Sequence, residues 1–224
     1  MDPGSTISQS LEDLYQEKGA GYFTGARRDY VAEMPVDPSA AILELGCGAG
    51  GTGALALNED KAGAYVGIEL FEPMAMAARR VLTTVHIGNV ETMDLPYGPR
   101  TFDALVCSEV LEHLTNPEAT LARLIPLLKP GGRVYASVPN LAHWKIVLGL
   151  LRGRFDYQER GAMDRTHLRW FTPRSFRALF EGAGVSVDHV APIGSSSPLR
   201  PLVSRLPLEH LLWFQIDLRG RRGA

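Results

Sequence analysis

The segment LELGCGAGGTG, residues 43–53, constrains the fold of this chain more than any other stretch of its sequence. It contains the glycine pattern G-x-G-x-x-G twice, once from Gly46 to Gly51 and once from Gly48 to Gly53. An apolar run precedes the glycines and a helical pattern follows them. Glycines at such a junction let the backbone turn sharply and approach a ligand closely. The segment therefore predicts a strand, a ligand-binding turn and a helix in direct succession.

Short apolar runs alternate with helical patterns through most of the 224 residues. Such alternation is typical of a mostly parallel sheet that is covered by helices on both faces. The predicted strands are residues 41–45, 64–69, 85–87, 102–108, 133–138, 185–190 and 210–218, and the predicted helices are residues 51–58, 73–82, 117–128 and 174–181. The sequence thus predicts a single α/β domain, 1–224, with a doubly wound, Rossmann-like sheet. This sheet is expected to be mostly parallel, with an antiparallel strand near one edge.

Two segments fall outside this alternation. Residues 1–35 contain a helical pattern and are expected to form an N-terminal cap. Residues 139–172 mix aromatic and charged side chains, and we expect them to lie over the carboxyl edge of the sheet as a lid or acceptor-binding insertion. Five aromatic side chains are candidates either for lining a pocket there or for forming the lid's own core: Trp144, Phe155, Tyr157, Trp170 and Phe171.

Composition excludes several classes of protein. The formal net charge of −2 lacks the positive excess that a nucleic-acid-binding protein normally shows. The longest apolar run, residues 146–151, is far shorter than the roughly 20 residues that span a bilayer. Cys47 and Cys107 make no disulfide framework and are expected to be packed thiols. The sequence therefore predicts a cytoplasmic protein with no membrane span and no nucleic-acid partner, and it leaves a homodimer open.

Charged residues around the glycines distinguish between ligands. Glu69 follows the glycines by about 20 residues, the spacing at which a carboxylate accepts ribose hydroxyls. Glu44, two residues before the first glycine of the motif, would repel a pyrophosphate but attract a cation. The alternative is that Glu44 points to solvent or pairs with an arginine such as Arg27 or Arg28. An NAD-dependent oxidoreductase would explain the glycines and Glu69, but it would leave Glu44 without a role.

Five stretches of the chain resemble the class I S-adenosylmethionine-dependent methyltransferases in order and spacing. They are ILELGCGAG, YVGIEL, GNVETMDLP, FDALVCSEVLEHLTNP and LLKPGGRVYASVPN, and the resemblance covers roughly residues 22–218. It implies methyl transfer with S-adenosylmethionine as the cofactor. The residues that it places at the cofactor are Glu44, Gly46, Cys47, Gly48, Gly50, Glu69, Leu70, Asn89, Val90, Ser108 and Glu109. Many members have Asp at the position of Asn89, which can also serve as a turn residue.

The N-terminal cap is expected to close over the cofactor, as its counterpart does in that family. Tyr22, Arg27 and Arg28 are its candidate contacts. This expectation comes from the resemblance alone.

Two histidines are candidates for the chemistry of the methyl acceptor, because a hydroxyl acceptor needs a base with a near-neutral pKa. His113 follows the fourth predicted strand in SEVLEHL, where a helical turn would bring Glu109 and Glu112 near it. It is either catalytic or part of the pocket wall. His167 lies in MDRTHLRWFTP and would be a base if a carboxylate oriented it. The alternative is that residues 164–167 form a structural hydrogen-bonded turn.

The acceptor is predicted from a further resemblance. The D-x-T-H-x-R-x-F-T stretch resembles methyltransferases of bacterial glycan and natural-product pathways, which implies a small-molecule acceptor and O-methylation of a sugar or glycan precursor. The alternative function is partner binding, because SVPNLAHW followed by LLRGRF resembles MetW-type proteins that associate with a homoserine acyltransferase. The histidines show no H-x-x-x-H or Cys/His cluster, so no metal site is predicted.

Overall fold

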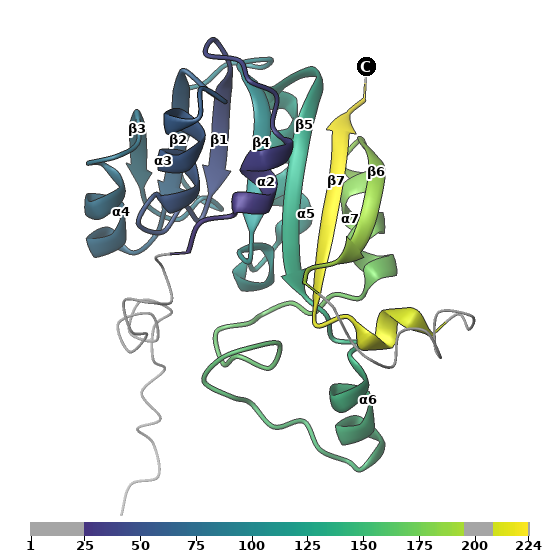
Figure 1. Ribbon diagram of the computed structural model, residues 1–224. Helices are drawn as coiled ribbons and strands as arrows, with labels where there is room; N and C mark the ends of the chain where they lie inside the picture. Colours follow the sequence, from purple (N-terminus) through teal and green to yellow (C-terminus); the bar gives the residue numbers. More distant parts are fainter. Residues whose placement is uncertain (1–24, 195–207, 224) are drawn as a thin grey trace, which may run out of the picture.

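A computed structural model of the protein describes residues 25–194 and 208–223. Its centre is a seven-stranded sheet with the strand order β3-β2-β1-β4-β5-β7-β6 (Figure 1). The strands are β1 (Ala41–Leu45), β2 (Ala64–Glu69), β3 (Thr84–Ile87), β4 (Phe102–Ser108), β5 (Leu128–Pro139), β6 (Val185–Pro192) and β7 (Gln215–Arg222). Strands β1 to β5 pair in parallel, whereas β7 is antiparallel to both β5 and β6. The predicted fold class, with an antiparallel strand next to one edge, is confirmed.

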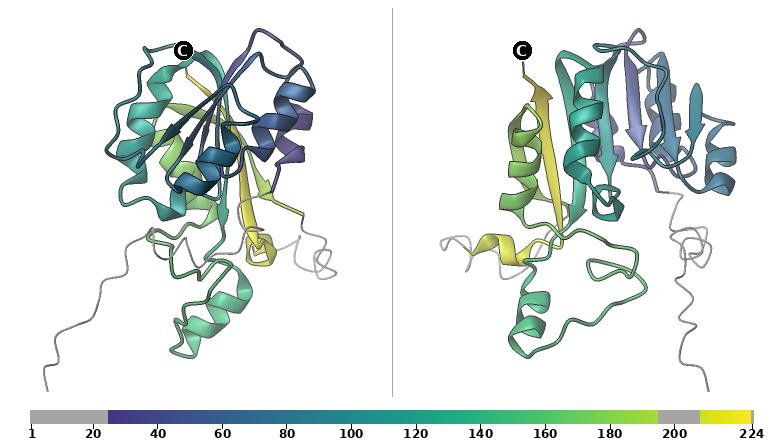
Figure 2. Two further views of the ribbon diagram at one scale, coloured as in Figure 1. Left: turned by 90° about the vertical axis from the view of Figure 1, so that its left-hand side faces the viewer. Right: turned by 180° about the vertical axis from the view of Figure 1, so that it is seen from behind.

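Helices cover both faces of this sheet. The described helices are α2 (Arg28–Glu33), α3 (Gly51–Asn58), α4 (Glu72–Ala78), α5 (Pro117–Leu124), α6 (Trp144–Leu151) and α7 (Pro173–Gly182), with short 3-10 turns η2 (Leu111–His113), η3 (Ile125–Leu127) and η4 (Glu209–Leu212). Helices α2 and α3 lie in front of the sheet in Figure 1, and α5 and α7 lie in front in the right-hand view of Figure 2. The domain therefore has three layers.

The alternation of side chains along each strand supplies a core to both faces. Leu43 and Leu45 pack into the cluster that includes α5 and α7, while Ile42 packs into the cluster that includes α2, α3 and α4. Successive side chains of a strand point to opposite faces, so a strand covered on both sides is apolar throughout. This is why the run AILEL predicts a central strand, and why its one charged residue, Glu44, is conspicuous.

The last predicted strand is placed wrongly by the sequence. Residues 210–218 were predicted to be one strand, but the chain forms η4 first and β7 begins only at Gln215. The side-chain amide of Asn140 donates hydrogen bonds to the carbonyl oxygens of His210 and Trp213, which holds this segment in a turn. Strand β7 continues to Arg222, beyond the predicted end at residue 218. Most of the RGRRG sequence, residues 219–223, therefore belongs to this strand.

Two helix ends and one strand start also differ from the prediction. Helix α5 ends at Leu124 and not at residue 128, since Pro126 has no N–H to continue the helical hydrogen bonds. Strand β5 then starts at Leu128, five residues before the predicted start, with a register shift against β4. Helix α4 ends at Ala78, where turns replace the predicted final residues 79–82.

The segment that follows β5 lies beyond the carboxyl ends of the parallel strands, as predicted. In Figure 1 the arrowheads of these strands point towards it, and it contains α6 followed by an extended loop. None of the described helices is long and apolar enough to cross a membrane.

Candidate active site

A cavity of about 630 Å³ opens at the carboxyl ends of the central parallel strands. Ligand pockets commonly have volumes of roughly 300–1,000 Å³, and open α/β sheets bind ligands at this edge. The predicted site residues that line it are Glu44, Gly46, Cys47, Gly48, Glu69, Leu70, Asn89, Val90, Ser108, Glu109, His113 and His167. The structure therefore gathers residues from the predicted cofactor and acceptor sites around one space.

The glycine turn forms the wall between β1 and α3. Gly46 and Gly48 have φ angles of +68° and +53°, in the left-handed region that side chains rarely adopt. The backbone N–H of Gly48 donates to Oε2 of Glu69 at 2.8 Å, and that of Phe71 donates to Oε1 at 2.8 Å. Each carboxylate oxygen has two lone pairs, so both oxygens keep one for a ligand. A fixed pair of acceptors suits two adjacent hydroxyl groups.

Gly50 is the one predicted cofactor residue that does not line the cavity. Its φ angle is +83°, and a Cβ there would meet Val81 at 2.9 Å and the Cα of Ala78 at 3.2 Å. The absence of a side chain at Gly50 thus lets the start of α3 pack against the end of α4. Packing of these helices is therefore a structural reason for a glycine at this position.

Glu44 lies at the floor of the cavity with 3% of its surface exposed. Its Oε2 atom has no hydrogen-bond partner among the described residues. Burial, with repulsion from Glu69, raises the pKa of Glu44 to about 8, against the attraction of Arg27. The ion pairs of Arg27 run to Asp29 and Asp217, so the alternative pairing of Glu44 with this arginine does not form.

Arg27 brings the N-terminal segment to the cavity. Its Nη1 atom donates to the hydroxyls of Ser108 and Ser137 at 2.8 and 2.6 Å, and its guanidinium lies over the ring of Tyr30 at 3.6 Å. Burial lowers the pKa of Arg27, but the hydrogen bond to Asp29 together with the charges of Tyr30, Asp29 and Asp217 outweighs this effect and raises it. Arg27 is thus a fixed cation in a wall that is otherwise acidic. Of the other two candidates of the cap, Tyr22 lies outside the described residues and Arg28 does not line the cavity.

Two further cofactor candidates show local features of interest. Oδ1 of Asn89 accepts from the backbone N–H of Glu91 at 2.9 Å, so this residue caps a turn and also lies at the cavity rim. Glu109 has a φ angle of +51° and accepts from the side chain of Gln215, while its other carboxylate oxygen has no partner. A non-glycine residue in this region costs free energy and is often found at functional sites.

The two cysteines are packed thiols, although Cys47 also lines the cavity, and the aromatic candidates of the insertion lie outside it. Burial raises the pKa of both thiols, Cys47 and Cys107, well above the usual range, as expected for packed cysteines. Of the five aromatic candidates of the insertion, none lines the cavity. Phe155 and Tyr157 pack against Trp170. Phe171 packs against the core residue Phe176, and Trp144 is exposed. Phe155, Tyr157 and Trp170 thus contact one another within the insertion, although Phe155 and Tyr157 are 43% and 49% exposed.

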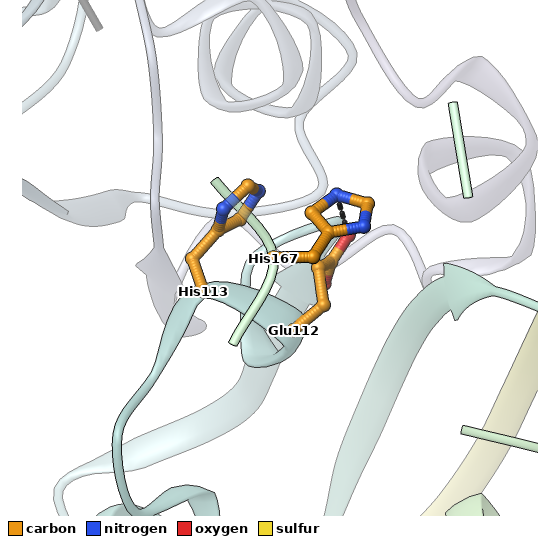
Figure 3. A group of neighbouring side chains, drawn as sticks. All are labelled: Glu112, His113 and His167. Atoms are coloured by element: carbon orange, nitrogen blue, oxygen red, sulfur yellow. Dashed lines mark ion pairs between the residues drawn. The ribbon is translucent and has the colours of Figure 1, made fainter. Parts of the chain in front are cut away.

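His113 and His167 lie close together at the cavity, where the methyl acceptor was predicted (Figure 3). Their ring centroids are 4.8 Å apart, and Nε2 of His167 lies 4.0 Å from Oε1 of Glu112. The carbonyl of Glu112 accepts the backbone N–H groups of Leu168 and Arg169, which ties the insertion to η2. Glu112, His113 and His167 each offer one atom that could bind a metal ion. Among the described residues, these three atoms lie within 4.8 Å of one another.

Residues 164–167 form the hydrogen-bonded turn that was the alternative to a catalytic role. Oδ1 of Asp164 accepts from the backbone N–H and the hydroxyl of Thr166 at 2.9 and 2.8 Å. This turn places the carbonyl of Thr166 at 3.1 Å from Nδ1 of His113. The turn is structural, and it also delivers His167 to the cavity.

Sequence reasoning gave Glu112 no role of its own and did not foresee that Asp164, Leu168, Phe214 and Gln215 line the cavity. The position of Glu112 beside His113 was a usable signal. For Gln215 no local signal exists, because β7 joins the site only through its pairing with β5.

Three features define the class of protein. They are the strand order of the sheet, the glycine turn after β1, and the carboxylate of Glu69 at the end of β2. This is the class I S-adenosylmethionine-dependent methyltransferase fold. The family described as "Methyltransferase domain" matches residues 16–190, and the chain belongs to this family.

Curated relatives come from quinone pathways by name. The chain is 29% identical to the demethylmenaquinone methyltransferase of Symbiobacterium thermophilum over 165 residues. This alignment covers 65% of each protein. It is 35% identical over 121 residues to the ubiquinone biosynthesis O-methyltransferase of Xanthomonas campestris pv. campestris, covering 51% of this chain and 49% of that protein. The chain thus matches about half to two thirds of the length of these relatives.

Solved structures share the fold. An S-adenosylmethionine-dependent methyltransferase from Mesorhizobium loti superposes with a TM-score of 0.61 at 18% identity, covering 91% of this chain and 100% of that one. A chain from the complex of the Haloferax volcanii Trm112 methyltransferase activator superposes with a TM-score of 0.67 at 19% identity, covering 96% and 98%. The [4+2]-cyclase SpnF superposes at 0.61 and 19% identity, covering 88% and 80%. At these identities the likeness concerns the fold alone.

Proposed function

We propose that the protein transfers a methyl group from S-adenosylmethionine to a hydroxyl oxygen of a small molecule. The observation that carries this proposal is the acidic cavity floor, where buried oxygens of Glu44 and Glu109 have no hydrogen-bond partner among the described residues. A buried carboxylate oxygen without a partner is costly, and a cationic ligand removes that cost. S-adenosylmethionine carries a sulfonium and an ammonium and no phosphate.

The cavity walls fit the remaining parts of this cofactor. Both oxygens of Glu69 are fixed as acceptors for the two ribose hydroxyls. Asn89 and Val90 border the space beside them and are proposed to flank the adenine. Arg27, held at Ser108, is a cation that can pair with the cofactor's carboxylate. When bound, the cofactor supplies an activated methyl group, whose sulfur departs as a neutral thioether.

The acceptor is expected at the end of the cavity formed by Glu112, His113 and His167. Methyl transfer to a hydroxyl releases a proton, and these three groups can receive or stabilise it. The protein must also hold the acceptor oxygen in line with the methyl carbon. The backbone hydrogen bonds between η2 and the insertion would help by fixing the positions of these side chains.

The finer identity of the acceptor has two candidates. The D-x-T-H-x-R-x-F-T resemblance favours a sugar or glycan precursor, and the name of the Xanthomonas relative favours a hydroxylated quinone precursor. Leu168 and Phe214 give the cavity an apolar side, which suits an aromatic ring better than a bare sugar. Both acceptor classes present a hydroxyl to the same histidines.

Calorimetric titration with S-adenosylmethionine, S-adenosylhomocysteine and NAD tests the cofactor, and radiolabelled methyl transfer to polyhydroxylated aromatics and sugar nucleotides tests the acceptor. We expect both adenosyl ligands to bind and NAD to remain unbound. Binding of NAD alone would contradict the proposal. Transfer to one panel and not to the other identifies the acceptor class.

A second candidate function is partner binding, as in the MetW-type alternative. Trp144, Leu148 and Leu151 of α6 are 41%, 37% and 78% exposed, which leaves apolar surface on this helix. Size-exclusion chromatography with light scattering, at several protein concentrations, distinguishes self-association from a monomer.

The homodimer and the exclusion of nucleic acid stay predictions. The proposed cytoplasmic location is supported by two free buried thiols, Cys47 and Cys107.

A further inference from the structure

A cluster of metal-ligand type lies at the acceptor end of the cavity, although the spacing of histidines in the sequence predicted none. Glu112, His113 and His167 are 1%, 6% and 6% exposed, and all three line the cavity. Oε2 of Glu112 is buried and has no hydrogen-bond partner within residues 25–194 and 208–223. A side chain that is this deeply buried and leaves an oxygen unsatisfied indicates that a further group belongs beside it.

The hydrogen bonds of both histidine rings favour the same orientation. Nδ1 of His113 lies 3.1 Å from the carbonyl oxygen of Thr166, and Nδ1 of His167 lies 3.3 Å from that of Ala162. A carbonyl oxygen only accepts, so in each contact Nδ1 is the donor. In a neutral ring the lone pair is then on Nε2. Metal-binding histidines are typically oriented in this way, by a backbone carbonyl at the other nitrogen.

The charge around the cluster also favours a cation. Glu109 and Asp164 lie near enough to Glu112 to repel it. Three carboxylates therefore gather near two histidine nitrogens that carry lone pairs. In His167 this nitrogen faces Oε1 of Glu112 at 4.0 Å. A cation between them turns this repulsion into attraction, since both atoms become its ligands.

From this geometry we propose that Glu112, His113 and His167 bind one divalent transition-metal ion of the zinc class. Two imidazole nitrogens and one carboxylate oxygen are a ligand set typical of catalytic zinc sites, which keep an open position for water or substrate. Ligands about 2.0–2.2 Å from zinc lie roughly 3.3–3.5 Å apart. The donors here lie within 4.8 Å of one another, so small side-chain rotations complete the site.

The open position would face the cavity, where the acceptor hydroxyl is expected. A hydroxyl bound to such an ion loses its proton more readily. During transfer the proton leaves for solvent, the oxygen bonds to the methyl carbon, and the electron pair of the broken carbon–sulfur bond stays on sulfur. This role rests on the proposed methyl transfer, whereas metal binding itself does not.

The experiment titrates Zn²⁺ and Co²⁺ into protein freed of metal by a chelator, with calorimetry for stoichiometry and visible absorption of Co²⁺ for ligand geometry. We expect one ion per chain. Affinity should fall at least about 100-fold in Glu112→Gln and His167→Gln, because each removes a direct ligand. His189→Gln is the matched control, since this exposed histidine lies on β6.

Binding of S-adenosylmethionine is measured for every variant. Retained cofactor binding shows that the variant is folded, and it keeps the two proposals separate. A lost metal site with an intact cofactor site supports the metal proposal. Metal binding that both variants retain at the parental affinity, or no binding by the parent protein, overturns it and leaves the cofactor assignment untouched.

A second measurement uses only the parent protein, so its result does not depend on whether the variants fold. The parent protein is treated with diethyl pyrocarbonate with and without Zn²⁺, and the modified histidines are mapped by mass spectrometry. We expect Zn²⁺ to slow modification of His113 and His167 at least about tenfold while His189 reacts at an unchanged rate. Equal rates at all three positions would contradict the proposal.

Discussion

The two ends of the cavity are built in different ways. The cofactor end is formed by turns that directly follow β1 and β2, so Gly46, Gly48 and Glu69 belong to short, continuous motifs. The proposed acceptor end joins η2 to the insertion through Glu112 and His167, which lie more than 50 residues apart along the chain. The first end is encoded locally, and the second depends on how distant segments pack. Substitutions at the two ends should therefore have separable effects.

The largest expected effect is at the cofactor end. Glu69→Ala should weaken S-adenosylmethionine binding by about 100-fold or more, because hydrogen bonds to a charged acceptor contribute roughly 1.5–3 kcal/mol each. Calorimetry measures the loss. Glu72→Ala, an exposed carboxylate three residues away, is the matched control. Thermal melting should also show some loss of stability, because Glu69 accepts two backbone N–H groups. Unchanged affinity would remove the ribose assignment.

At the acceptor end, Asp164→Ala should reduce methyl transfer by about 10- to 100-fold while cofactor affinity stays within about twofold. The substitution leaves the N–H and hydroxyl of Thr166 without their acceptor, at roughly 1–3 kcal/mol for each unsatisfied group, and displaces the carbonyl that orients His113. Asp164→Asn keeps an oxygen in place and should be milder. A parallel loss of cofactor binding would show that the two ends are not separable.

A smaller effect concerns protons at the cofactor end. The pKa of Glu44 is raised to about 8 in the folded protein, so at pH 7 this carboxyl is mostly protonated. A bound sulfonium favours the carboxylate, so binding should release up to about one proton and strengthen by up to about tenfold between pH 7 and 8. Titrations in buffers with different ionisation heats measure this release, which Glu44→Gln should abolish.

The same pKa shift has a consequence for stability. Because the folded-state pKa of Glu44 lies above the unfolded value, its contribution to stability is lost as pH rises from about 4.5 towards 8. Glu44→Gln should therefore raise the melting temperature of the ligand-free protein more at pH 8 than at pH 5. An equal change at both pH values would contradict the pKa shift.

The smallest expected effect is at the junction between the insertion and α7. The hydroxyl of Thr172 accepts from Ser175 at the start of α7, in a capping box. Thr172→Ala should lower the free energy of unfolding by about 1 kcal/mol, as measured by urea denaturation. Arg174→Ala, in the same turn and exposed, should change it by about 0.5 kcal/mol or less. Cofactor affinity should be unchanged in both variants.

The sequence predicts the elements that carry their own signal. Strands β1, β2 and β4 have the predicted bounds, because central parallel strands are continuous apolar runs between turns. Strand β7 was predicted in the wrong place, since the apolar residues 211–214 resemble a strand but are held in a turn by Asn140. Pairing partners far along the chain decided this segment, and a local pattern contains no information about them.

The candidate site divides in the same way. The amino-acid sequence by itself determined the glycine turn, the carboxylates Glu44 and Glu69 and the cofactor class, because each belongs to a motif whose geometry is set within a few residues. Only the tertiary structure decided that His113 and His167 meet, and that Glu112 lies beside them. Side chains from separate segments come together through the packing of the insertion on η2, and their spacing along the chain does not reveal this contact.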